Sequence, residues 1–224
     1  MRLVVLDVDG TLVDSQALIV AAQREAFARC GLPAPTRERS LSIVGLSLRE
    51  AFTALVGPDG PVEALAEAYR EAFGRLRADQ SLEEPLFPGA AALVARLSRR
   101  PDVLLGIATG KSRRGVAHLL AREGWEPLFA TIQTADDAPS KPDPTMLRQA
   151  MRETGCAPGE TAMVGDTSFD MAMARGAGIR AIGVAWGYHP RAALLEAGAD
   201  LVIDRFEALD VAAGLASRPE TADA

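Results

Sequence analysis

Short apolar runs alternate with amphipathic stretches along most of the chain, and this alternation is the feature that most limits its fold. The runs are almost continuous in hydrophobic residues, as strands buried on both faces of a sheet must be. The stretches between them, such as GAAALVARLSRR and PTMLRQAMRETG, have helical spacing. Strands that alternate with helices form right-handed βαβ units, so the pattern predicts an α/β fold, a Rossmann-like parallel sheet with helices on both faces. We expect strands at residues 3–6, 103–108, 129–132, 162–164, 181–185 and 201–203.

The connection between the first two expected strands breaks this alternation because it is far longer than the others. Its pattern is almost wholly helical, with SQALIVAAQREAFARCG, LREAFTALV and the stretch that begins at Pro61 as the expected helices. The Pro-rich segment EPLFPG then returns the chain to the alternating pattern. We therefore expect two domains, a Rossmann-like core of residues 1–14 and 88–224 and an inserted all-helical domain of residues 15–87.

The charge balance excludes one class of partner. The 224 residues carry a formal net charge of −6 at pH 7, so no basic stripe is available to neutralise nucleic-acid phosphates.

The apolar run before Asp7 is too short for a signal peptide or a membrane span. Two cysteines far apart in the sequence make no metal-ligand pair and fit a reducing compartment. We expect a cytoplasmic protein that binds neither nucleic acid nor membranes, and the sequence leaves its oligomeric state open.

Polar side chains follow four of the expected strands, at the points where those strands end. Asp7 follows the first strand and Thr109 the second. The segment SKPDP, which contains Lys141, follows the third, and the fourth is followed by Asp166 and then Asp170. In open parallel sheets, ligands bind beyond the carboxyl ends of the strands. We expect these side chains to converge on one edge of the sheet.

The residue types in this group predict the chemistry of the site. Clustered carboxylates repel one another unless a cation joins them, and an all-oxygen cluster suits Mg²⁺ rather than zinc. Thr109 and Lys141 add a hydroxyl and a positive charge, while Gly10 and Gly110 would let backbone N–H groups approach an anion closely. Mg²⁺ beside an anion cradle predicts that a phosphoryl group binds here. Asp170 has a second interpretation, an ordinary carboxylate in the first turn of a helix.

Four segments together resemble the motifs of the haloacid dehalogenase superfamily. They are DVDGT at residues 7–11, the threonine that ends the second strand, SKPDP and GDTSFD. The chain is similar to the phosphatase branch, in members with a helical cap inserted after the first strand, and most resembles phosphoglycolate phosphatase-like proteins. The resemblance covers the whole expected core in the same order. One departure is Gly110, where many relatives have asparagine after the threonine.

The resemblance implies roles for the residues of this site. Asp7 would attack phosphorus and form an aspartyl-phosphate, and Asp9 would protonate the leaving alkoxide and later activate water. Thr109 and Lys141 would hold the phosphoryl oxygens, with backbone contacts from Gly10 and Gly110.

The resemblance also implies a cofactor and a substrate class. Mg²⁺ would be bound by the carboxylates of Asp7 and Asp166 and by the backbone carbonyl of Asp9. Asp170 would orient Lys141 or a metal-bound water, and the helical cap would close over the substrate and exclude water. The implied enzyme is a Mg²⁺-dependent phosphoric monoester hydrolase that acts on a small phosphorylated metabolite, with 2-phosphoglycolate suggested by similarity.

Other functions stay open at this point. A sugar phosphomutase or a pyrophosphatase of the same superfamily would use the same pair of aspartates. A signalling module that keeps a phosphoryl group on an aspartate without turnover would also combine aspartates, a threonine and a lysine around Mg²⁺.

Three further features have two interpretations each. Lys111 would either steady the phosphoryl group or the closed cap, or lie solvated at the start of a helix. Arg37, Arg39 and Arg49 would either meet an anionic substrate or lie solvated in a loop. The segment WGYHP after the fifth strand would either line the rim of the site or pack against the core.

Overall fold

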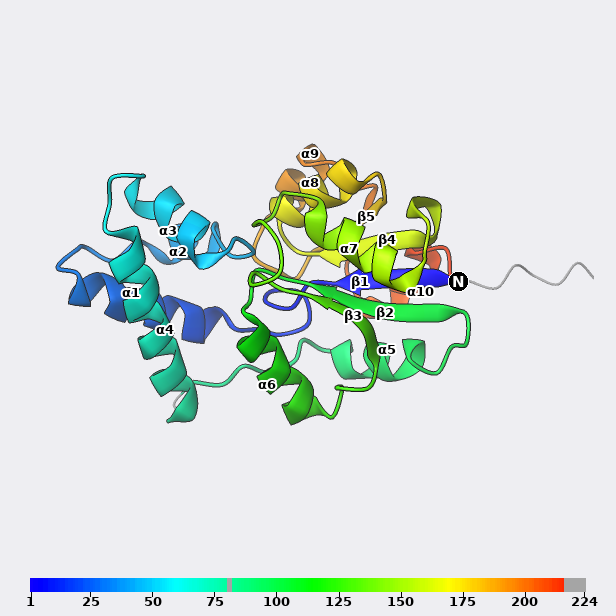
Figure 1. Cartoon of the computed structure of the whole chain (residues 1–224), viewed down its shortest axis with the longest axis horizontal. Coiled ribbons are helices and arrows are strands. Elements are labelled where there is room, and N and C mark those ends of the chain that lie inside the picture. The colour runs from blue at the N-terminus through cyan, green and yellow to red at the C-terminus, as the bar shows by residue number, and fades with distance from the viewer. Residues whose placement is uncertain (80–81, 216–224) are drawn as a thin grey trace, which may run out of the picture.

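The computed structural model describes residues 1–79 and 82–215 and contains one parallel sheet of six strands in the order β3-β2-β1-β4-β5-β6 (Figure 1). The strands are β1 (Arg2–Leu6), β2 (Val103–Ala108), β3 (Phe129–Gln133), β4 (Thr161–Gly165), β5 (Arg180–Val184) and β6 (Leu201–Ile203). Each lies within one or two residues of the position expected from its apolar run. The α/β, Rossmann-like parallel sheet predicted from the sequence is confirmed. The stretches 80–81 and 216–224, which the expected domains include, lie outside the described residues.

Helices pack on both faces of the sheet. They are α5 (Ala90–Leu97), α6 (Arg113–Glu123), α7 (Thr145–Thr154), α8 (Ser168–Ala177), α9 (Arg191–Glu196) and α10 (Leu209–Ala212), with short 3₁₀ turns η1 (Pro158–Glu160) and η2 (Phe206–Ala208). Alternate residues of β1 serve the two faces, because successive side chains of a strand point in opposite directions. Val4 and Leu6 belong to the apolar cluster shared with α5, α6 and α10. Leu3 and Val5 belong to the cluster shared with α7, α8 and α9.

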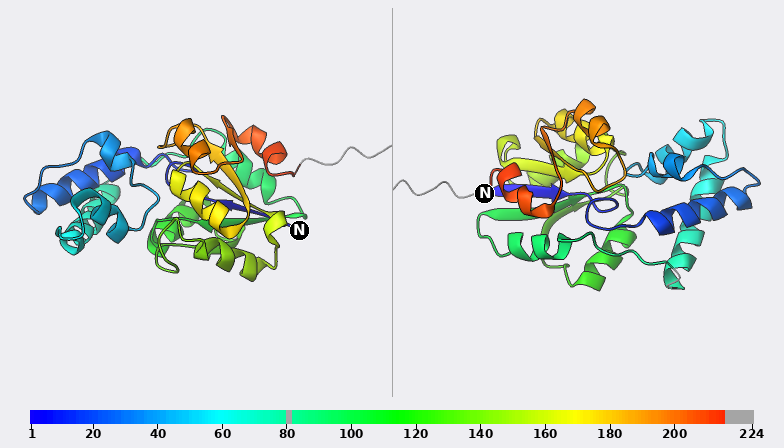
Figure 2. Two further views of the ribbon diagram at one scale, coloured as in Figure 1. Left: turned by 90° about the horizontal axis from the view of Figure 1, so that it is seen from above. Right: turned by 180° about the vertical axis from the view of Figure 1, so that it is seen from behind.

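The helices between β1 and α5 stand apart at one end of the molecule (Figures 1 and 2). They are α1 (Gln16–Arg29), α2 (Arg37–Leu41), α3 (Leu48–Val56) and α4 (Val62–Ala78). An apolar cluster that includes Phe27, Phe52 and Leu65 holds α1, α3 and α4 together. The sequence analysis missed α2, because a helix of five residues is too short to show a periodic pattern. The side chain of Thr36 caps this helix by accepting a hydrogen bond from the Arg39 N–H.

The two chain segments that join this helical insertion to the sheet run side by side. The Asp14 N–H donates to the Pro85 carbonyl at 2.8 Å, and the Phe87 N–H donates to the Leu12 carbonyl at 2.9 Å. Val13 and Leu86 form an isolated antiparallel bridge between these bonds. The crossing is therefore a short two-stranded strap rather than two loose loops. The division into two domains with boundaries at 14/15 and 87/88 stays a prediction.

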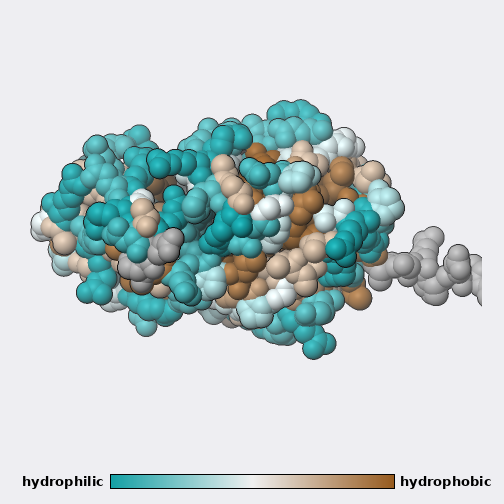
Figure 3. Space-filling model, turned by 90° about the horizontal axis from the view of Figure 1, so that it is seen from below, coloured by the Kyte–Doolittle hydropathy of each residue, from teal (hydrophilic) through white to brown (hydrophobic). Residues whose placement is uncertain are grey.

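The surface of the helical end is mainly hydrophilic on the face shown in Figure 3, and more hydrophobic surface is visible over the sheet-bearing part. Within residues 1–79 and 82–215, no helix has both the length and the apolar character that crossing a membrane requires.

Candidate active site

The carboxyl end of β1 places Asp7 at the centre of the molecule. The Asp7 N–H still donates to the Val164 carbonyl at 2.9 Å, so the backbone continues the sheet while the side chain projects beyond its edge. Lys141 Nζ lies 2.9 Å from Asp7 Oδ1 and 2.6 Å from Asp170 Oδ1, with its side chain wholly buried. A buried ammonium is stable only beside opposite charges, and here two carboxylates provide them. Burial alone would lower the pKa of Lys141, but Asp170 and Asp7 outweigh burial and raise it.

The carboxylate of Asp7 is poorly satisfied. It is 1% exposed, and neither of its oxygens accepts a well-directed hydrogen bond from the described part of the chain, although Lys141 approaches as an ion pair. Burial raises the pKa of Asp7 to about 6; Lys141 opposes this shift, while Asp170 and Asp9 add to it. A buried carboxylate without hydrogen bonds is costly. The site therefore holds an acceptor group ready for a cation or for covalent chemistry.

Asp166, at the end of β4, faces Asp7 across the sheet edge. Its Oδ1 accepts a hydrogen bond from the Thr11 hydroxyl at 2.9 Å, and its Oδ2 accepts one from the Tyr188 N–H at 2.9 Å. Burial, followed by the charges of Asp7 and Asp170, raises the pKa of Asp166 well above its usual range. One oxygen from each of Asp7, Asp166 and Asp170 lies within 4.8 Å of the others.

This all-oxygen group fits a magnesium ion. Mg²⁺ prefers carboxylate oxygens, and both oxygens of Asp7 lack hydrogen bonds from the described residues. Asp170 is less available, because its Oδ1 accepts from Lys141 and its Oδ2 accepts from the N–H and hydroxyl of Thr167. Asp7 and Asp166 are therefore the side chains best placed to hold the ion. Both sequence interpretations of Asp170 apply, since it lies in the first turn of α8 and also holds Lys141.

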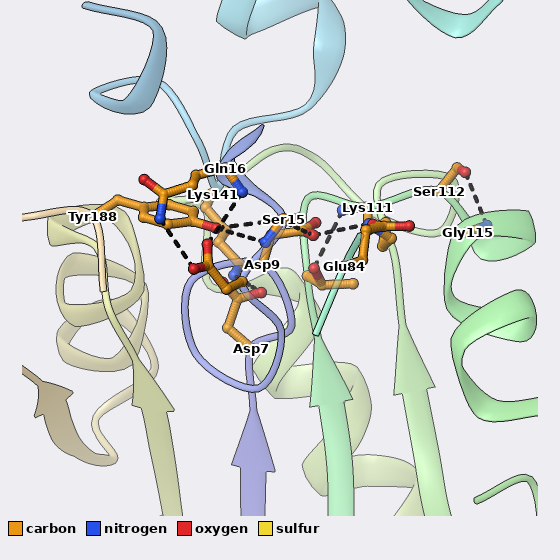
Figure 4. Close-up of polar contacts among 12 residues, drawn as sticks. Asp7, Asp9, Ser15, Gln16, Glu84, Lys111, Ser112, Gly115, Lys141 and Tyr188 are labelled. Carbon is orange, nitrogen blue, oxygen red and sulfur yellow. Dashed lines mark hydrogen bonds and ion pairs between the residues drawn. The ribbon is translucent and has the colours of Figure 1, made fainter. Parts of the chain in front are cut away.

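Asp9 takes part in a second network, turned away from Asp7 (Figure 4). Its Oδ1 accepts hydrogen bonds from the Ser15 hydroxyl at 2.7 Å and from Lys111 Nζ at 2.8 Å. Lys111 Nζ also lies 3.5 Å from a carboxylate oxygen of Glu84 and 5.3 Å from the centre of the Phe73 ring. The Lys111 side chain is 11% exposed, so the interpretation as a solvated helix start is wrong.

Glycines permit two close approaches in this site. Gly10 has φ +86°, and a Cβ there would lie 2.1 Å from Asp166 Oδ2. The Gly10 N–H donates to the Val13 carbonyl, so the geometry supports close packing against Asp166 rather than the predicted donation to an anion. A Cβ at Gly110 would lie 2.5 Å from the Gly45 carbonyl oxygen, so the helical insertion touches the core here.

Thr109, the other sequence-predicted residue of this edge, is buried directly after β2. Its N–H donates to the Gln133 carbonyl at 3.0 Å, which continues the pairing with β3. Its hydroxyl accepts a hydrogen bond from the Lys111 N–H at 3.2 Å. Thr109 also lines the cavity that contains Asp7 and Asp9. Every residue predicted for this site therefore lies at the carboxyl edge of the sheet.

The loop after β5 takes part in the site, which the sequence analysis left open. The Tyr188 hydroxyl accepts a hydrogen bond from the Ser15 N–H at 3.0 Å, and the Tyr188 N–H bonds to Asp166. Trp186 packs edge-on against Phe206 with ring centroids 4.5 Å apart, so this segment packs against the core and also contacts Asp166. A Cβ at Gly187 would lie 2.1 Å from Asp166 Cβ, so only glycine fits at this position. The sequence around Gly187 carries no motif that predicts this contact.

The helical insertion contacts the sheet edge near Asp7 and Asp9. The Ser47 N–H donates to the Ser140 hydroxyl at 2.8 Å, which joins the start of α3 to the residue before Lys141. Between the insertion and the core lies a cavity of about 380 Å³ that contains both aspartates in its lining. Arg49 also lines it but pairs with Glu63 at 3.3 Å, while Arg39 donates to the Ala54 carbonyl.

Comparison with known proteins agrees with this geometry. Residues 4–184 match the model of the haloacid dehalogenase-like hydrolase family. The chain belongs to this family. It is 34% identical over 207 residues to a protein of Dickeya dadantii named probable phosphatase IndB, with 91% of this chain and 90% of that protein covered. It is 32% identical over 213 residues to phosphoglycolate phosphatase 1 of Pseudomonas aeruginosa, with 93% and 78% covered.

Solved structures of the haloacid dehalogenase-like hydrolase family share the fold. A hydrolase from Pseudomonas syringae superposes with a TM-score of 0.84 at 27% identity, over 97% of this chain and 100% of that one. The resemblance drawn from the four motifs is thereby confirmed, as is the expectation of a hydrolase of this superfamily.

Proposed function

We propose that this protein is a Mg²⁺-dependent phosphatase that hydrolyses small phosphate monoesters through an aspartyl-phosphate at Asp7. The observation that carries the proposal is the buried Asp7 carboxylate, held beside Lys141 and Asp166, with the ion pair to Lys141 as its close polar contact and no well-directed hydrogen bond from the described residues. Two relatives with phosphatase names support the reaction class. One of them is named for phosphoglycolate, which makes 2-phosphoglycolate a candidate substrate.

The reaction proceeds in two displacements at phosphorus. An Asp7 oxygen forms a bond to phosphorus while the bond from phosphorus to the alcohol oxygen breaks, and Asp9 gives its proton to that oxygen. Water then attacks the aspartyl-phosphate, its proton passes to Asp9, and the bond between phosphorus and Asp7 breaks. The products are the alcohol and inorganic phosphate, and both aspartates return to their starting states.

Charge neutralisation comes from the residues around Asp7. Lys141 lies close enough to Asp7 to contact a phosphoryl oxygen as well, and Thr109 offers a hydroxyl at the same edge. Mg²⁺ bound by Asp7, Asp166 and the Asp9 backbone carbonyl would supply a second positive charge to the phosphoryl oxygens. Asp170 positions Lys141, because its Oδ1 lies 2.6 Å from the ammonium.

The Asp9 network is suited to proton transfer. Ser15 and Lys111 both bond to Oδ1, so they fix the carboxylate plane while Asp9 also lines the cavity that would hold the leaving alcohol. The helical insertion acts as a cap that closes over the substrate and excludes bulk water. The free thiols of Cys30 and Cys156 fit a reducing compartment, and we place the enzyme in the cytoplasm.

A panel of phosphate monoesters assayed for phosphate release, with Mg²⁺ and with EDTA, tests this proposal. We expect turnover that requires Mg²⁺ and falls by orders of magnitude in Asp7→Asn. Asp14→Asn, a matched change in the same segment whose carboxylate bonds to Gln16, controls for the substitution itself. Activity that EDTA leaves intact would contradict the metal site. Transfer of the phosphoryl group to a sugar without phosphate release would indicate a phosphomutase instead.

A further inference from the structure

The cavity beside Asp7 and Asp9 is larger than a two-carbon leaving group requires. Its volume is about 380 Å³. At about 30 Å³ for each water of the liquid, this space equals roughly a dozen waters, and cavities of about 300–1,000 Å³ hold ligands of drug size. A phosphoryl group and a glycolate would leave much of it unfilled. The inference about what fills the remaining space rests on the proposed function, because it requires the phosphoryl group to lie at Asp7.

The wall of the cavity on the cap side is aromatic. Tyr69 and Phe73, both on α4, are partly exposed and line it, with ring centroids 5.6 Å apart. Phe52 on α3 stacks edge-on against Tyr69 at 5.8 Å. Burial, together with the charges of Asp9 and Glu84, raises the pKa of Tyr69, so the phenol stays neutral beside the site. Aromatic walls favour planar groups, which stack against them.

The cations of the lining differ in whether they are already paired with a carboxylate. Lys111 is held by Asp9 and Glu84, Arg49 by Glu63, and Arg77 lies over the Phe73 ring at 5.5 Å. The other lining arginines, Arg70 and Arg114, are solvent-exposed. The lining cation that contacts Asp9, Lys111, is therefore already paired, whereas Arg70, Arg77 and Arg114 form no ion pair within the described residues.

Two polar groups of the lining differ in their access to the cavity. The Tyr69 hydroxyl has no hydrogen-bond partner within residues 1–79 and 82–215, and its oxygen is accessible rather than buried. Gln23, on α1, is 2% exposed, and its Oε1 is buried without a hydrogen bond while its Nε2 donates to the Ser40 carbonyl. Buried polar atoms of native proteins are nearly always bonded. A ligand in the cavity can therefore reach the Tyr69 hydroxyl but not Gln23 Oε1, which has no accessible surface.

Gly74 belongs to the part of α4 that lines the cavity. An added Cβ at Gly74 would meet nothing within 4 Å. Glycine is disfavoured inside a helix, second only to proline, so the helical conformation of α4 does not require a glycine at this position. Any larger side chain at this position would extend into free space along α4, the helix that carries the aromatic wall.

From these observations we propose that the leaving alcohol of the natural substrate carries a planar ring with hydrogen-bonding groups. This is the chemical class of the nucleoside 5′-monophosphates. The phosphoryl group lies at Asp7, the ring lies along Tyr69 and Phe73, and its polar edge bonds to the Tyr69 hydroxyl. The cap therefore selects by the shape of the ring and by its hydrogen bond to Tyr69.

The test compares kcat/KM for uridine and adenosine 5′-monophosphates with kcat/KM for 2-phosphoglycolate and glycerol 3-phosphate, in the presence of Mg²⁺. We expect at least one nucleotide to exceed both small esters by tenfold or more. In Gly74→Leu, which fills the free space, the ratio of nucleotide to phosphoglycolate kcat/KM falls at least tenfold. Gly74→Ala is the matched control, because it makes a similar gain in helix propensity but fills little space and shifts the ratio far less. Tyr69→Phe raises KM for the nucleotide with little change in kcat.

The outcomes separate this inference from the proposed function. Mg²⁺-dependent hydrolysis of 2-phosphoglycolate that exceeds every nucleotide, or a ratio that Gly74→Leu leaves unchanged, overturns the inference while the phosphatase stands. Hydrolysis of none of these esters overturns the phosphatase proposal and the inference with it.

Discussion

Replacement of Asp7 by asparagine is expected to abolish turnover and, in the absence of metal, to stabilise the fold at neutral pH. The reason is the cost of holding a charged Asp7 in its buried place, where burial raises its pKa from 3.8 to about 6. An acid whose pKa is higher in the folded state holds its proton more tightly there. Protonated Asp7 therefore adds its full contribution to the free energy of unfolding below pH 3.8, and this contribution is lost as the pH rises through 6. Asparagine carries no charge to desolvate.

The size of the effect follows from the shift. A rise of about two pKa units means that Asp7 contributes about 3 kcal/mol to the free energy of unfolding at low pH. About 2 kcal/mol of this contribution is lost between about pH 4 and pH 8. Lys141 keeps Asp170 as its partner in the variant, so the ammonium is not left unpaired. With a urea m-value of about 2 kcal/mol/M, the unfolding midpoint of Asp7→Asn should gain about 1 M on the wild type between these pH values.

The assay is urea unfolding of both proteins in EDTA at pH 4 and pH 8, followed by circular dichroism. Asp14→Asn, which lies outside the buried cluster, should show no such pH-dependent gain. A difference between Asp7→Asn and wild type that does not change with pH would refute the reasoning. The reasoning would also be refuted if the loss of unfolding free energy in Asp7→Asn, relative to the wild type, were larger at pH 8 than at pH 4.

Three further predictions test other parts of the site. Binding of Mg²⁺ to the metal-free protein can be followed by calorimetry in buffers of different ionisation enthalpy. Below pH 6 we expect binding to release one proton and the affinity to rise about tenfold for each pH unit, because the ion replaces the proton on Asp7. An affinity that does not depend on pH would contradict this. Lys111→Met should lower kcat about 10²-fold with a smaller change in KM, because Asp9 loses its orienting bond; unchanged kcat would remove Lys111 from the mechanism. Gly10→Ala should lower the free energy of unfolding by about 1–3 kcal/mol more than Gly31→Ala, which also has positive φ but meets nothing within 4 Å; equal losses would show that contact with Asp166 is unimportant.

The fold and the centre of the site could be predicted because both depend on local patterns. An apolar run buried on two faces shows its strand directly, and the residue that follows it must lie at the sheet edge. Asp7, Lys141 and Asp166 could therefore be brought together without coordinates. Residues that act through contacts between distant segments could not.

Glu84, Tyr188 and Lys111 illustrate that limit. Glu84 reaches Lys111 only because the two linkers run side by side, and Tyr188 reaches Asp166 only because β5 lies beside β4. The burial of Lys111 depends on Phe73, which belongs to the insertion. None of these pairings leaves a periodic or motif-like signal in the sequence. The ring-lined cavity is of the same kind, since its walls come from α1, α3 and α4 as well as the sheet edge.

The most direct test of the central claim is to trap the covalent intermediate. The enzyme is mixed with a ³²P-labelled phosphate monoester and Mg²⁺, quenched in acid within milliseconds, and digested so that the labelled peptide can be sequenced. The account predicts label on Asp7 at a level that rises and decays with turnover, and none in Asp7→Asn. Label on another residue, or release of phosphate by Asp7→Asn at the wild-type rate, would contradict it.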